Sequence, residues 1–372
     1  MPYQKRPMFK MLGMLLLISV VQAATLFKVP LTTSLIAGDP AVPDRNAAFM
    51  TTVSLQAGNF QTWSNVLVDT GSCLVWVGGT DQQQYIPGSH SVPMNESFGA
   101  GYGSAGASGT AYLDRVTLGE ATVNRQVIGA ANYSYMSSFE PFDGILGLGV
   151  PGCNGGEVSG YSTTPTFVEG LVAEGSIESP VFGIYIPPLS EEGISEGTGD
   201  ITFGGIDESR ISGEIVWIPQ IPPYTNRYVL NISSVSYGST VVQSEPVATY
   251  TDTGNVALGL PFDAFFAIYQ TVPGAGLDIT SDLQGSITFS LNTSADALLP
   301  VTISFQGVNS SLDISIPSSK YLVPKSLYPT LNMTDDVLHS WILPGVLGQN
   351  FLQNVYSAYD QENHLIGFAN LA

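Results

Sequence analysis

The chain has 372 residues and a formal net charge of −20 at pH 7, and its length is enough for two domains with a large buried core. So negative a chain is unsuited to binding nucleic acid, because phosphates attract basic surfaces. Only 2 cysteines are present, so the chain can form at most one internal disulfide.

The first 23 residues have the pattern of a secretory signal peptide. A basic stretch with Lys5, Arg6 and Lys10 precedes an apolar run over 11–20. A signal anchor is the alternative, but the run is short for a bilayer and no second apolar run of about 20 residues follows it. We therefore expect a signal peptide over 1–23, a secreted, extracellular protein, and no membrane contact once the signal is removed.

Beyond this segment, the sequence predicts mostly β structure. Short runs in which apolar and polar residues alternate, as at 110–118 and 213–218, are typical of half-buried strands. Helices are predicted at 165–174 and 261–270, because each segment opens on proline, which is accepted at the first helical position. A third, shorter helix is predicted at 335–340.

The tripeptide Asp-Thr-Gly occurs twice, beginning at Asp69 and at Asp252, each time after an extended apolar run. One copy would be an ordinary turn sequence, but two copies in similar settings favour a paired function. Two carboxyls held close together in a partly buried cleft cannot both ionise cheaply, so one keeps its proton while the other stays charged. Such a pair can activate water and protonate an amide carbonyl, which makes Asp69 and Asp252 candidate catalytic residues.

The residues beside each aspartate suit the same role. Gly71 and Gly254 permit a sharp turn that leaves the carboxyl accessible. Thr70 and Thr253 each offer a hydroxyl group on a stiff side chain, which is suited to holding the loop from inside. The duplication also predicts two structural units, with a boundary near 205–220.

The two cysteines lie near features that this duplication singles out. Cys73 is four residues after Asp69, and Cys153 closely follows the apolar stretch 145–149. If the two segments lie side by side, a disulfide would close a loop of about 80 residues and contribute roughly 4 kcal/mol of stability. Two separate buried thiols are the alternative.

The sequence also carries Asn-x-Ser/Thr sequons, the acceptor sites for N-glycosylation. In a secreted chain these positions predict surface glycans. The six asparagines are Asn95, Asn132, Asn231, Asn292, Asn309 and Asn332.

Other motifs lack the context that their chemistry needs. The segment 101–106 fits a dinucleotide-binding fingerprint, but strand-like alternation follows it instead of a helix, so a glycine-rich hairpin tip is predicted. The 3 histidines form no zinc-spaced pair, and no Gly-x-Ser-x-Gly nucleophile elbow occurs. We expect no metal and no organic cofactor.

Together these features resemble the pepsin-like aspartic endopeptidases, most closely the polyporopepsin-like fungal branch. The likeness runs from about Phe49 to the C-terminus. It implies an all-β, bilobal fold with two barrel-like lobes, a deep cleft between them, a β-hairpin flap and few short helices. The segments that carry the resemblance are 66–77, 102–112, 142–149, 199–207, 252–254, 346–360 and 366–369.

The resemblance also implies how the chain is divided. An N-terminal lobe over 46–210 would carry the first aspartate and the flap, and a C-terminal lobe over 211–372 would carry the second. The segment 24–45 would be a short pro-segment or N-terminal extension.

The family likeness assigns roles to individual residues. Asp69 and Asp252 would form the catalytic dyad, with the Ser72 hydroxyl donating a hydrogen bond to the first aspartate. Tyr102 would be the flap tyrosine, and Trp76 the indole whose N–H meets its hydroxyl. The remaining flap residues, and the residue that lines the pocket for the side chain before the scissile bond, would be Gly103, Ser104 and Ile145.

Two positions depart from the family pattern. Cys73 stands where a second serine is usual, which suits a disulfide. Asn255 stands where a threonine or serine normally supports the second aspartate. Because an amide can still donate to a carboxylate, we expect altered pKa tuning rather than loss of activity.

The sequence thus predicts a secreted, monomeric aspartic endopeptidase that hydrolyses internal bonds of polypeptide substrates in acid. Bulky apolar side chains are expected on either side of the cut. A catalytically inactive relative, which uses the same cleft to bind or inhibit a protein, is the alternative. A secreted carbohydrate-binding or wall protein built of β-sandwiches is a third interpretation.

Overall fold

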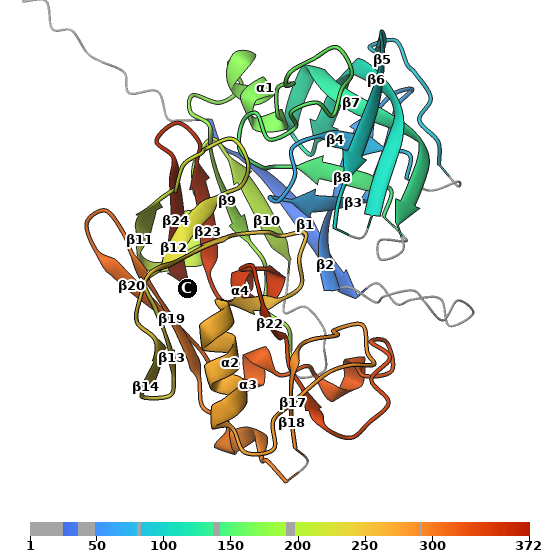
Figure 1. The fold of residues 1–372 in the computed structure, drawn as a ribbon. Helices are drawn as coiled ribbons and strands as arrows, with labels where there is room; N and C mark the ends of the chain where they lie inside the picture. The colour runs from blue at the N-terminus through green and yellow to red at the C-terminus, as the bar shows by residue number, and fades with distance from the viewer. Residues whose placement is uncertain are drawn as a thin grey trace, which may run out of the picture.

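The computed structural model describes residues 25–35, 49–79, 83–103, 105–136, 142–190, 198–290 and 292–372. The predicted signal peptide, part of the predicted segment 24–45 and Ser104 lie outside these ranges. Two lobes are seen in Figure 1, the N-terminal one coloured blue to green and the C-terminal one orange to red, with strands of a shared sheet between them.

The N-terminal lobe is built around a closed barrel. Its strands are β2 (Phe49–Ala57), β3 (Gln61–Asp69), β4 (Val75–Val77), β5 (Val92–Gly101), β6 (Ala105–Leu118), β7 (Ala121–Met136) and β8 (Gly144–Gly147). Neighbours follow the order β2-β3-β8-β4-β7-β6, and a pairing between β2 and β6 closes the ring. The predicted strand at 110–118 is confirmed within β6, and the predicted hairpin tip joins β5 to β6.

A shared sheet connects the two halves of the chain. It consists of β1 (Phe27–Leu35), β9 (Val181–Tyr185), β10 (Gly199–Phe203), β11 (Ile211–Pro219), β23 (Tyr356–Asp360) and β24 (Leu365–Leu371). Strand β23, near the C-terminus, pairs with β9 from the N-terminal half. On this sheet the rings of Phe182 and Tyr359 stack with their centroids 4.8 Å apart, so the core is continuous between the lobes.

The C-terminal lobe is also mostly β. Its strands are β12 (Val229–Ile232), β13 (Ser234–Tyr237), β14 (Thr240–Gln243), β15 (Val247–Tyr250), β16 (Leu258–Leu260), β17 (Gly276–Leu277), β18 (Ile287–Phe289), β19 (Val301–Gln306), β20 (Ser311–Ile316), β21 (Leu338–His339) and β22 (Ile342–Pro344). Four of them form a sheet in the order β14-β13-β19-β20, and the others form smaller sheets beside it.

Two of the three predicted helices are confirmed. They are α1 (Phe167–Ala173), which begins with a capping box formed by Thr166 and Glu169, and α2 (Phe262–Thr271). Two single-turn helices, α3 (Ser318–Tyr321) and α4 (Gln349–Leu352), were not predicted. No helix in the described ranges is long and apolar enough to cross a membrane.

The predicted helix at 335–340 is wrong, because that segment contains strand β21, which pairs with β18. Its His339 is buried between two carboxylates: Nδ1 lies 2.7 Å from Asp278 Oδ2, and Nε2 lies 2.8 Å from Asp335 Oδ1. The pairing with β18 and the contact with Asp278 hold the segment extended, and both partners are remote in sequence, so local patterns do not predict them.

Each half carries an aspartate loop on the same kind of support. In the N-terminal lobe, β3 runs parallel to β8, and Asp69 is paired with Gly147 at the end of both strands. In the C-terminal lobe, β16 runs parallel to β22, and a parallel bridge joins Thr251 to Leu347 beside the second aspartate. The repeated parallel pairing places both Asp-Thr-Gly loops at the junction of the lobes.

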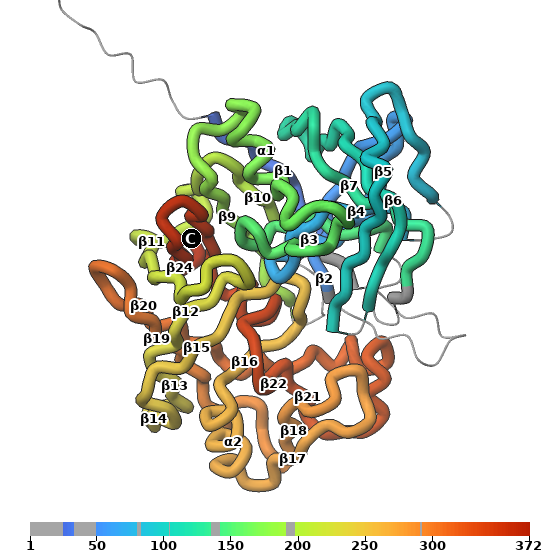
Figure 2. The backbone as a smooth tube through the Cα atoms, turned by 45° about the horizontal axis from the view of Figure 1, so that its top comes forward, coloured from blue at the N-terminus to red at the C-terminus, as the bar shows by residue number. Residues whose placement is uncertain are grey.

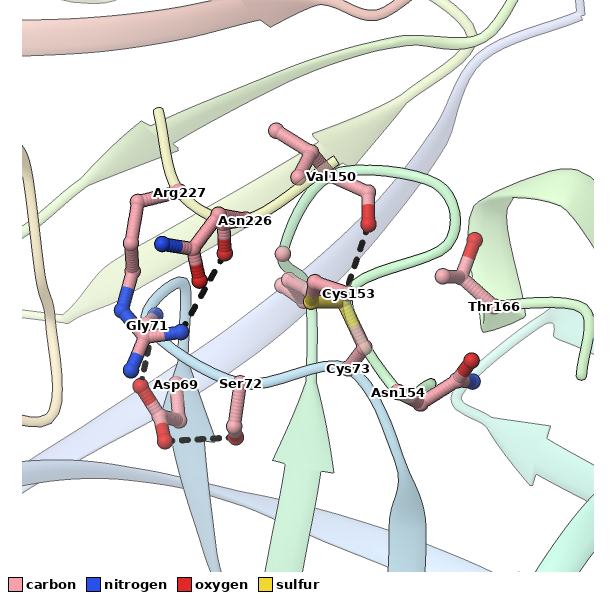
Figure 3. Close-up of a disulfide and its surroundings, with 12 residues drawn as sticks. Asp69, Gly71, Ser72, Cys73, Val150, Cys153, Asn154, Thr166, Asn226 and Arg227 are labelled. Atoms are coloured by element: carbon pink, nitrogen blue, oxygen red, sulfur yellow. Dashed lines mark hydrogen bonds between the residues drawn. A yellow bond between two sulfur atoms is a disulfide. The ribbon is translucent and has the colours of Figure 1, made fainter. Parts of the chain in front are cut away.

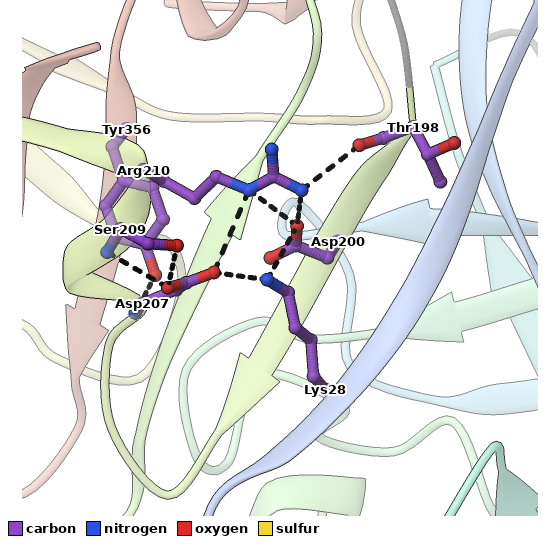
Figure 4. Close-up of polar contacts among 7 residues, drawn as sticks. All are labelled: Lys28, Thr198, Asp200, Asp207, Ser209, Arg210 and Tyr356. Atoms are coloured by element: carbon purple, nitrogen blue, oxygen red, sulfur yellow. Dashed lines mark hydrogen bonds and ion pairs between the residues drawn. The ribbon is translucent and has the colours of Figure 1, made fainter. Parts of the chain in front are cut away.

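An ion-pair cluster fastens β1 into the shared sheet (Figure 4). Asp200 on β10 is buried, and its Oδ2 accepts hydrogen bonds from Arg210 Nε at 3.0 Å and Nη2 at 2.5 Å. Lys28 on β1 pairs with Asp207 and lies 3.6 Å from Asp200 Oδ2. The Arg210 guanidinium also covers the ring of Tyr185, with Cζ 4.3 Å from the ring centroid.

The cluster makes the stability of the fold sensitive to acid. Burial alone would raise the pKa of Asp207, but hydrogen bonds from Lys28 and Ser209 outweigh it and hold that pKa below its usual range. Because the folded-state pKa is lowered, the stabilisation is present above the ordinary carboxyl value of about 4 and is lost as pH falls through the lowered value.

Replacing Arg210 tests this cluster. We expect Arg210→Met to lower the free energy of unfolding by roughly 2 kcal/mol at pH 6, because the buried Asp200 carboxylate loses its main partner. Urea unfolding followed by tryptophan fluorescence measures the loss. The exposed Arg125 provides the matched control: Arg125→Met should change stability by less than about 0.5 kcal/mol. Equal effects of the two substitutions would contradict the assignment.

Candidate active site

The two Asp-Thr-Gly loops meet and are joined by reciprocal hydrogen bonds. Asp69 ends β3, and Asp252 follows β15 after a single residue. The Thr70 N–H donates to Thr253 Oγ1 at 2.9 Å, and the Thr253 N–H donates to Thr70 Oγ1 at 3.1 Å. Both threonine side chains are fully buried, and Thr253 Oγ1 also donates to the carbonyl of Val68 at 2.7 Å. Each threonine hydroxyl therefore binds the backbone of the opposite loop.

This arrangement brings the two carboxyls together. The N–H of Gly71 donates to Asp69 Oδ1 at 2.7 Å, and the N–H of Gly254 donates to Asp252 Oδ1 at 2.9 Å. A Cβ atom on Gly71 would lie 2.7 Å from the Asp252 carboxyl, and one on Gly254 would lie 2.8 Å from Asp69 Oδ1. Each carboxyl thus occupies the space above the other loop's glycine, so the two carboxyls are close enough for Asp69 to raise the pKa of Asp252.

The surroundings of the two carboxyls differ. Asp69 accepts a second hydrogen bond, from Ser72 Oγ to Oδ2 at 2.6 Å. Asn255, at the matching position, instead uses its Oδ1 to accept the N–H of Ala257 at 2.9 Å. Among the described residues, no hydrogen bond joins the Asn255 side chain to Asp252.

The pKa of Asp252 is raised above its ordinary carboxyl value. Burial raises the pKa of Asp252 most, and the negative charge of Asp69 and the hydrogen bond between the carboxyls raise it further. The hydrogen bond from Gly254 and the positive charge of Arg227 lower it by less. Asp252 is therefore the member with the raised pKa, whereas Asp69 accepts two of the described hydrogen bonds.

The hairpin of β5 and β6 extends from the N-terminal lobe towards the C-terminal lobe (Figure 2). At its tip Tyr102 receives a hydrogen bond on its hydroxyl from Trp76 Nε1 at 2.7 Å. Burial raises the pKa of Tyr102 well above its ordinary value, so its phenol stays neutral. Trp76 pairs with Ile145 across β4 and β8, and both side chains are buried. Gly103 is exposed at the tip.

The predicted disulfide is confirmed between Cys73 and Cys153, whose Cα atoms are 5.8 Å apart (Figure 3). The two separate thiols are thereby excluded. A Cβ atom on Gly149 would lie 2.8 Å from both sulfur atoms, so the glycine leaves room for the bridge. The disulfide connects the loop that carries Asp69 to the loop after β8, residues 150–164, which carries Glu157.

A cavity of ≈ 420 Å³ opens over the two aspartates, with walls from both halves of the chain. Sequence analysis missed two charged residues in it, Glu157 and Arg227, because neither belongs to a motif with a characteristic spacing. Within the described ranges, no three His, Cys, Asp or Glu side chains are grouped as metal ligands. The lining residues are Asp69, Gly71, Ser72, Gly101, Tyr102, Gly103, Cys153, Glu157, Arg227, Tyr250, Asp252, Gly254 and Asn255.

Removal of the disulfide should destabilise the protein without removing any donor to the aspartates. We expect the double variant Cys73→Ser/Cys153→Ser to lose roughly 4 kcal/mol of unfolding free energy, because the bridge closes a long loop. Urea unfolding without reductant measures the loss. The reduced wild-type protein should unfold like the variant; a variant as stable as the oxidised protein would contradict the structural role of the bridge.

Comparison with known proteins agrees with this architecture. The family model for eukaryotic aspartyl proteases matches residues 49–371. Polyporopepsin from Irpex lacteus is 29% identical over 343 residues, which cover 88% of this chain and 96% of the relative. Human gastricsin is 30% identical over 325 residues, covering 82% of this chain and 78% of the relative.

A solved structure has the same fold along almost the whole chain. The crystal structure of the aspartic proteinase from Irpex lacteus superposes with a TM-score of 0.78 at 26% identity, covering 94% of this chain and 98% of that one. The predicted all-β, bilobal, pepsin-like fold is thereby confirmed. The chain belongs to the eukaryotic aspartyl protease family and is an aspartic-type endopeptidase.

Proposed function

We propose that Asp69 and Asp252 are the catalytic pair with which this endopeptidase hydrolyses internal peptide bonds of polypeptides in acid. The observation that carries this proposal is the close pair of carboxyls with unequal donors. Ser72 and Gly71 both donate to Asp69, whereas Gly254 alone donates to Asp252. The pair therefore offers one base and one acid in the same cavity.

The proposed reaction needs only these two groups and one water molecule. The Asp69 carboxylate takes a proton from the water, whose oxygen attacks the carbonyl carbon, while Asp252 gives its proton to the carbonyl oxygen. A neutral tetrahedral diol results. In its breakdown the amide nitrogen takes the proton from Asp69, the C–N bond breaks, and Asp252 recovers a proton from one hydroxyl. The roles of acid and base can thus alternate between the two aspartates along the reaction.

The flap is proposed to close over the substrate and exclude solvent. Tyr102 is held by Trp76, and excluding water from the cavity strengthens each hydrogen bond to the reacting carbonyl. Beneath the flap lies an apolar cluster that includes Trp76, Phe98, Phe142 and Ile145. The four side chains are buried and pack with Tyr102, which lines the cavity, so we propose that the apolar surface at this tyrosine accepts a bulky apolar side chain before the scissile bond.

The remaining proposals concern secretion, oligomeric state, the bounds of the two lobes and glycosylation. We propose that it is secreted after cleavage of 1–23, that it acts as a monomer, and that 46–210 and 211–372 are its two lobes, with 24–45 as a short pro-segment or extension. The side chains of all six sequon asparagines are exposed, which is compatible with glycosylation. The described part of 24–45 includes β1, which pairs with β10 and β2.

Substitution of either aspartate tests the mechanism. We expect Asp69→Asn and Asp252→Asn each to lower kcat by at least about a thousandfold on denatured globin, because each removes one partner of the proton exchange. The exposed Asp313 on β20 gives the matched control, and Asp313→Asn should keep wild-type activity. Unchanged hydrolysis in either active-site variant would show that the catalytic groups lie elsewhere in the molecule.

The pH profile tests the same assignment independently. Because the pKa of Asp252 is raised, the acid member keeps its proton throughout the acid range, and the rate should peak in acid and fall when that proton is lost. Hydrolysis that is fastest above pH 8 would contradict the proposal.

The inactive relative remains the second candidate, since Asn255 does not support Asp252 as a hydroxyl would. A statine-type transition-state mimic distinguishes the readings when binding and turnover are measured on one preparation. Tight binding together with hydrolysis favours the enzyme. Tight binding without hydrolysis at any pH would favour a protein-binding role.

A further inference from the structure

Arg227 places a positive charge in the cavity that contains the two aspartates. It lies just before β12, and Figure 3 shows its side chain extending from that segment towards the Asp69 loop. Its Cζ is 5.7 Å from the centroid of the Tyr250 ring, which also lines the cavity, and Nη1 donates to the carbonyl of Asn226 at 3.2 Å. Among the described residues, no carboxylate oxygen lies within the 4.0 Å of an ion pair with this guanidinium.

Most of the hydrogen-bonding capacity of Arg227 is therefore unused by the described part of the chain. A guanidinium has five N–H donors in a planar fork that matches a carboxylate, and only one donation is present here. The positive charge also lowers the pKa of Asp252, so its field reaches the reacting groups. A substrate bound across the aspartates would bring one of its side chains near this guanidinium.

Glu157 faces the same cavity from the N-terminal lobe. Its loop is fixed by the Cys73–Cys153 bridge and by a hydrogen bond from the Gly99 N–H, on the flap strand β5, to the Glu157 carbonyl at 2.8 Å. The side-chain atom Oε2 is buried and has no hydrogen-bond partner among the described residues. Burial raises the pKa of Glu157 to about 7, and the charge of Asp69 adds to the rise, whereas Arg227 opposes it.

Glu157 is thus neutral in acid and does not cancel the charge of Arg227. A neutral carboxyl also gives no attraction to a lysine or arginine of the substrate. Under the conditions of the proposed reaction, Arg227 is therefore the one cationic side chain among the described lining residues, and it forms no ion pair with Asp69 in the same cavity. The ring of Tyr250 and the backbone carbonyl of Asn226 hold the Arg227 guanidinium in place.

We propose that Arg227 is a specificity-determining residue, which binds the carboxylate of a glutamate or aspartate close to the scissile bond. This inference rests on the proposed function of the same site. It replaces the expectation of apolar side chains on both sides of the cut: the apolar surface at Tyr102 accepts one flanking side chain, and Arg227 selects an acidic one across the aspartates.

The preference for an acidic substrate side chain should depend on pH, because both the substrate carboxyl and Glu157 titrate. The titratable groups that face Arg227 across the cavity are Asp69, Asp252, Glu157, Tyr102 and Tyr250. A substrate glutamate ionises near pH 4, so its attraction to Arg227 grows as pH rises through that value. As pH approaches 7, Glu157 ionises and competes for the same cation. The preference for an acidic side chain should therefore be largest between these two values.

A matched peptide series tests the proposal. Each peptide carries a phenylalanine before the intended cut, and a glutamate or its neutral isostere glutamine is placed in turn at each of the two positions before and the three positions after it. We expect wild-type enzyme at pH 5 to cleave the glutamate peptide about tenfold faster in kcat/KM than the glutamine peptide at one of these positions, as for a desolvated charge pair. The ratio should fall towards 1 at pH 3.

The variants separate recognition from other roles of the residue. In Arg227→Met the ratio should fall to about 1 at pH 5, mostly through KM, while Arg227→Lys should keep part of it because the charge remains. The control Arg125→Met should keep the wild-type ratio. A statine peptide without acidic side chains should still bind to Arg227→Met in calorimetry, which shows that the cavity is intact.

Three results would overturn the inference. If wild-type enzyme cleaves the glutamate and glutamine peptides equally at every position, Arg227 does not select an acid. If Arg227→Met slows both peptides by the same factor, the residue acts only on the aspartate pair. If wild-type enzyme cleaves none of the peptides and also fails on denatured globin, the proposed function itself fails and the inference falls with it.

Discussion

The site depends above all on the reciprocal hydrogen bonds between Thr70 and Thr253. These two buried hydroxyls join loops that lie 183 residues apart in the chain, and each accepts the backbone N–H of the other loop. Two carboxyls held this close repel each other whenever both are ionised. The threonines, which carry no charge, supply the attachment that keeps the carboxyls in contact. The parallel strands β3 and β8, with β16 and β22, hold each loop from behind.

On this symmetric support, the chemistry comes from an asymmetry. Ser72 donates to one carboxyl, while Asn255, at the equivalent place in the second loop, turns its amide oxygen to the Ala257 N–H. Asp252 therefore has fewer donors among the described residues, and its pKa is raised. The disulfide from Cys73 to Cys153 ties the first aspartate loop to the segment that carries Glu157. One wall of the cavity is thereby fixed relative to the aspartates.

The sequence was sufficient for the features that local patterns encode. The duplicated tripeptide predicted the meeting of Asp69 and Asp252, and a proline near each helix start located α1 and α2, although Pro165 precedes the N-cap of α1 and Pro261 is itself the N-cap of α2. It failed where a distant partner decides the outcome. The segment around His339 is extended because it pairs with β18 and contacts Asp278, and Arg227 lies in the cavity although no motif marks it. Contacts of this kind form only when remote segments pack, so spacing along the chain carries no trace of them.

We propose that the two carboxyls share one proton and that it resides on Asp252. Neutron diffraction from deuterated crystals of the ligand-free enzyme, grown near pH 5, locates that proton directly. We expect carboxyl oxygens of Asp69 and Asp252 within hydrogen-bonding distance, with the deuteron bonded to Asp252. A deuteron bonded to Asp69, or carboxyl oxygens more than about 5 Å apart without a bridging solvent molecule, would contradict it.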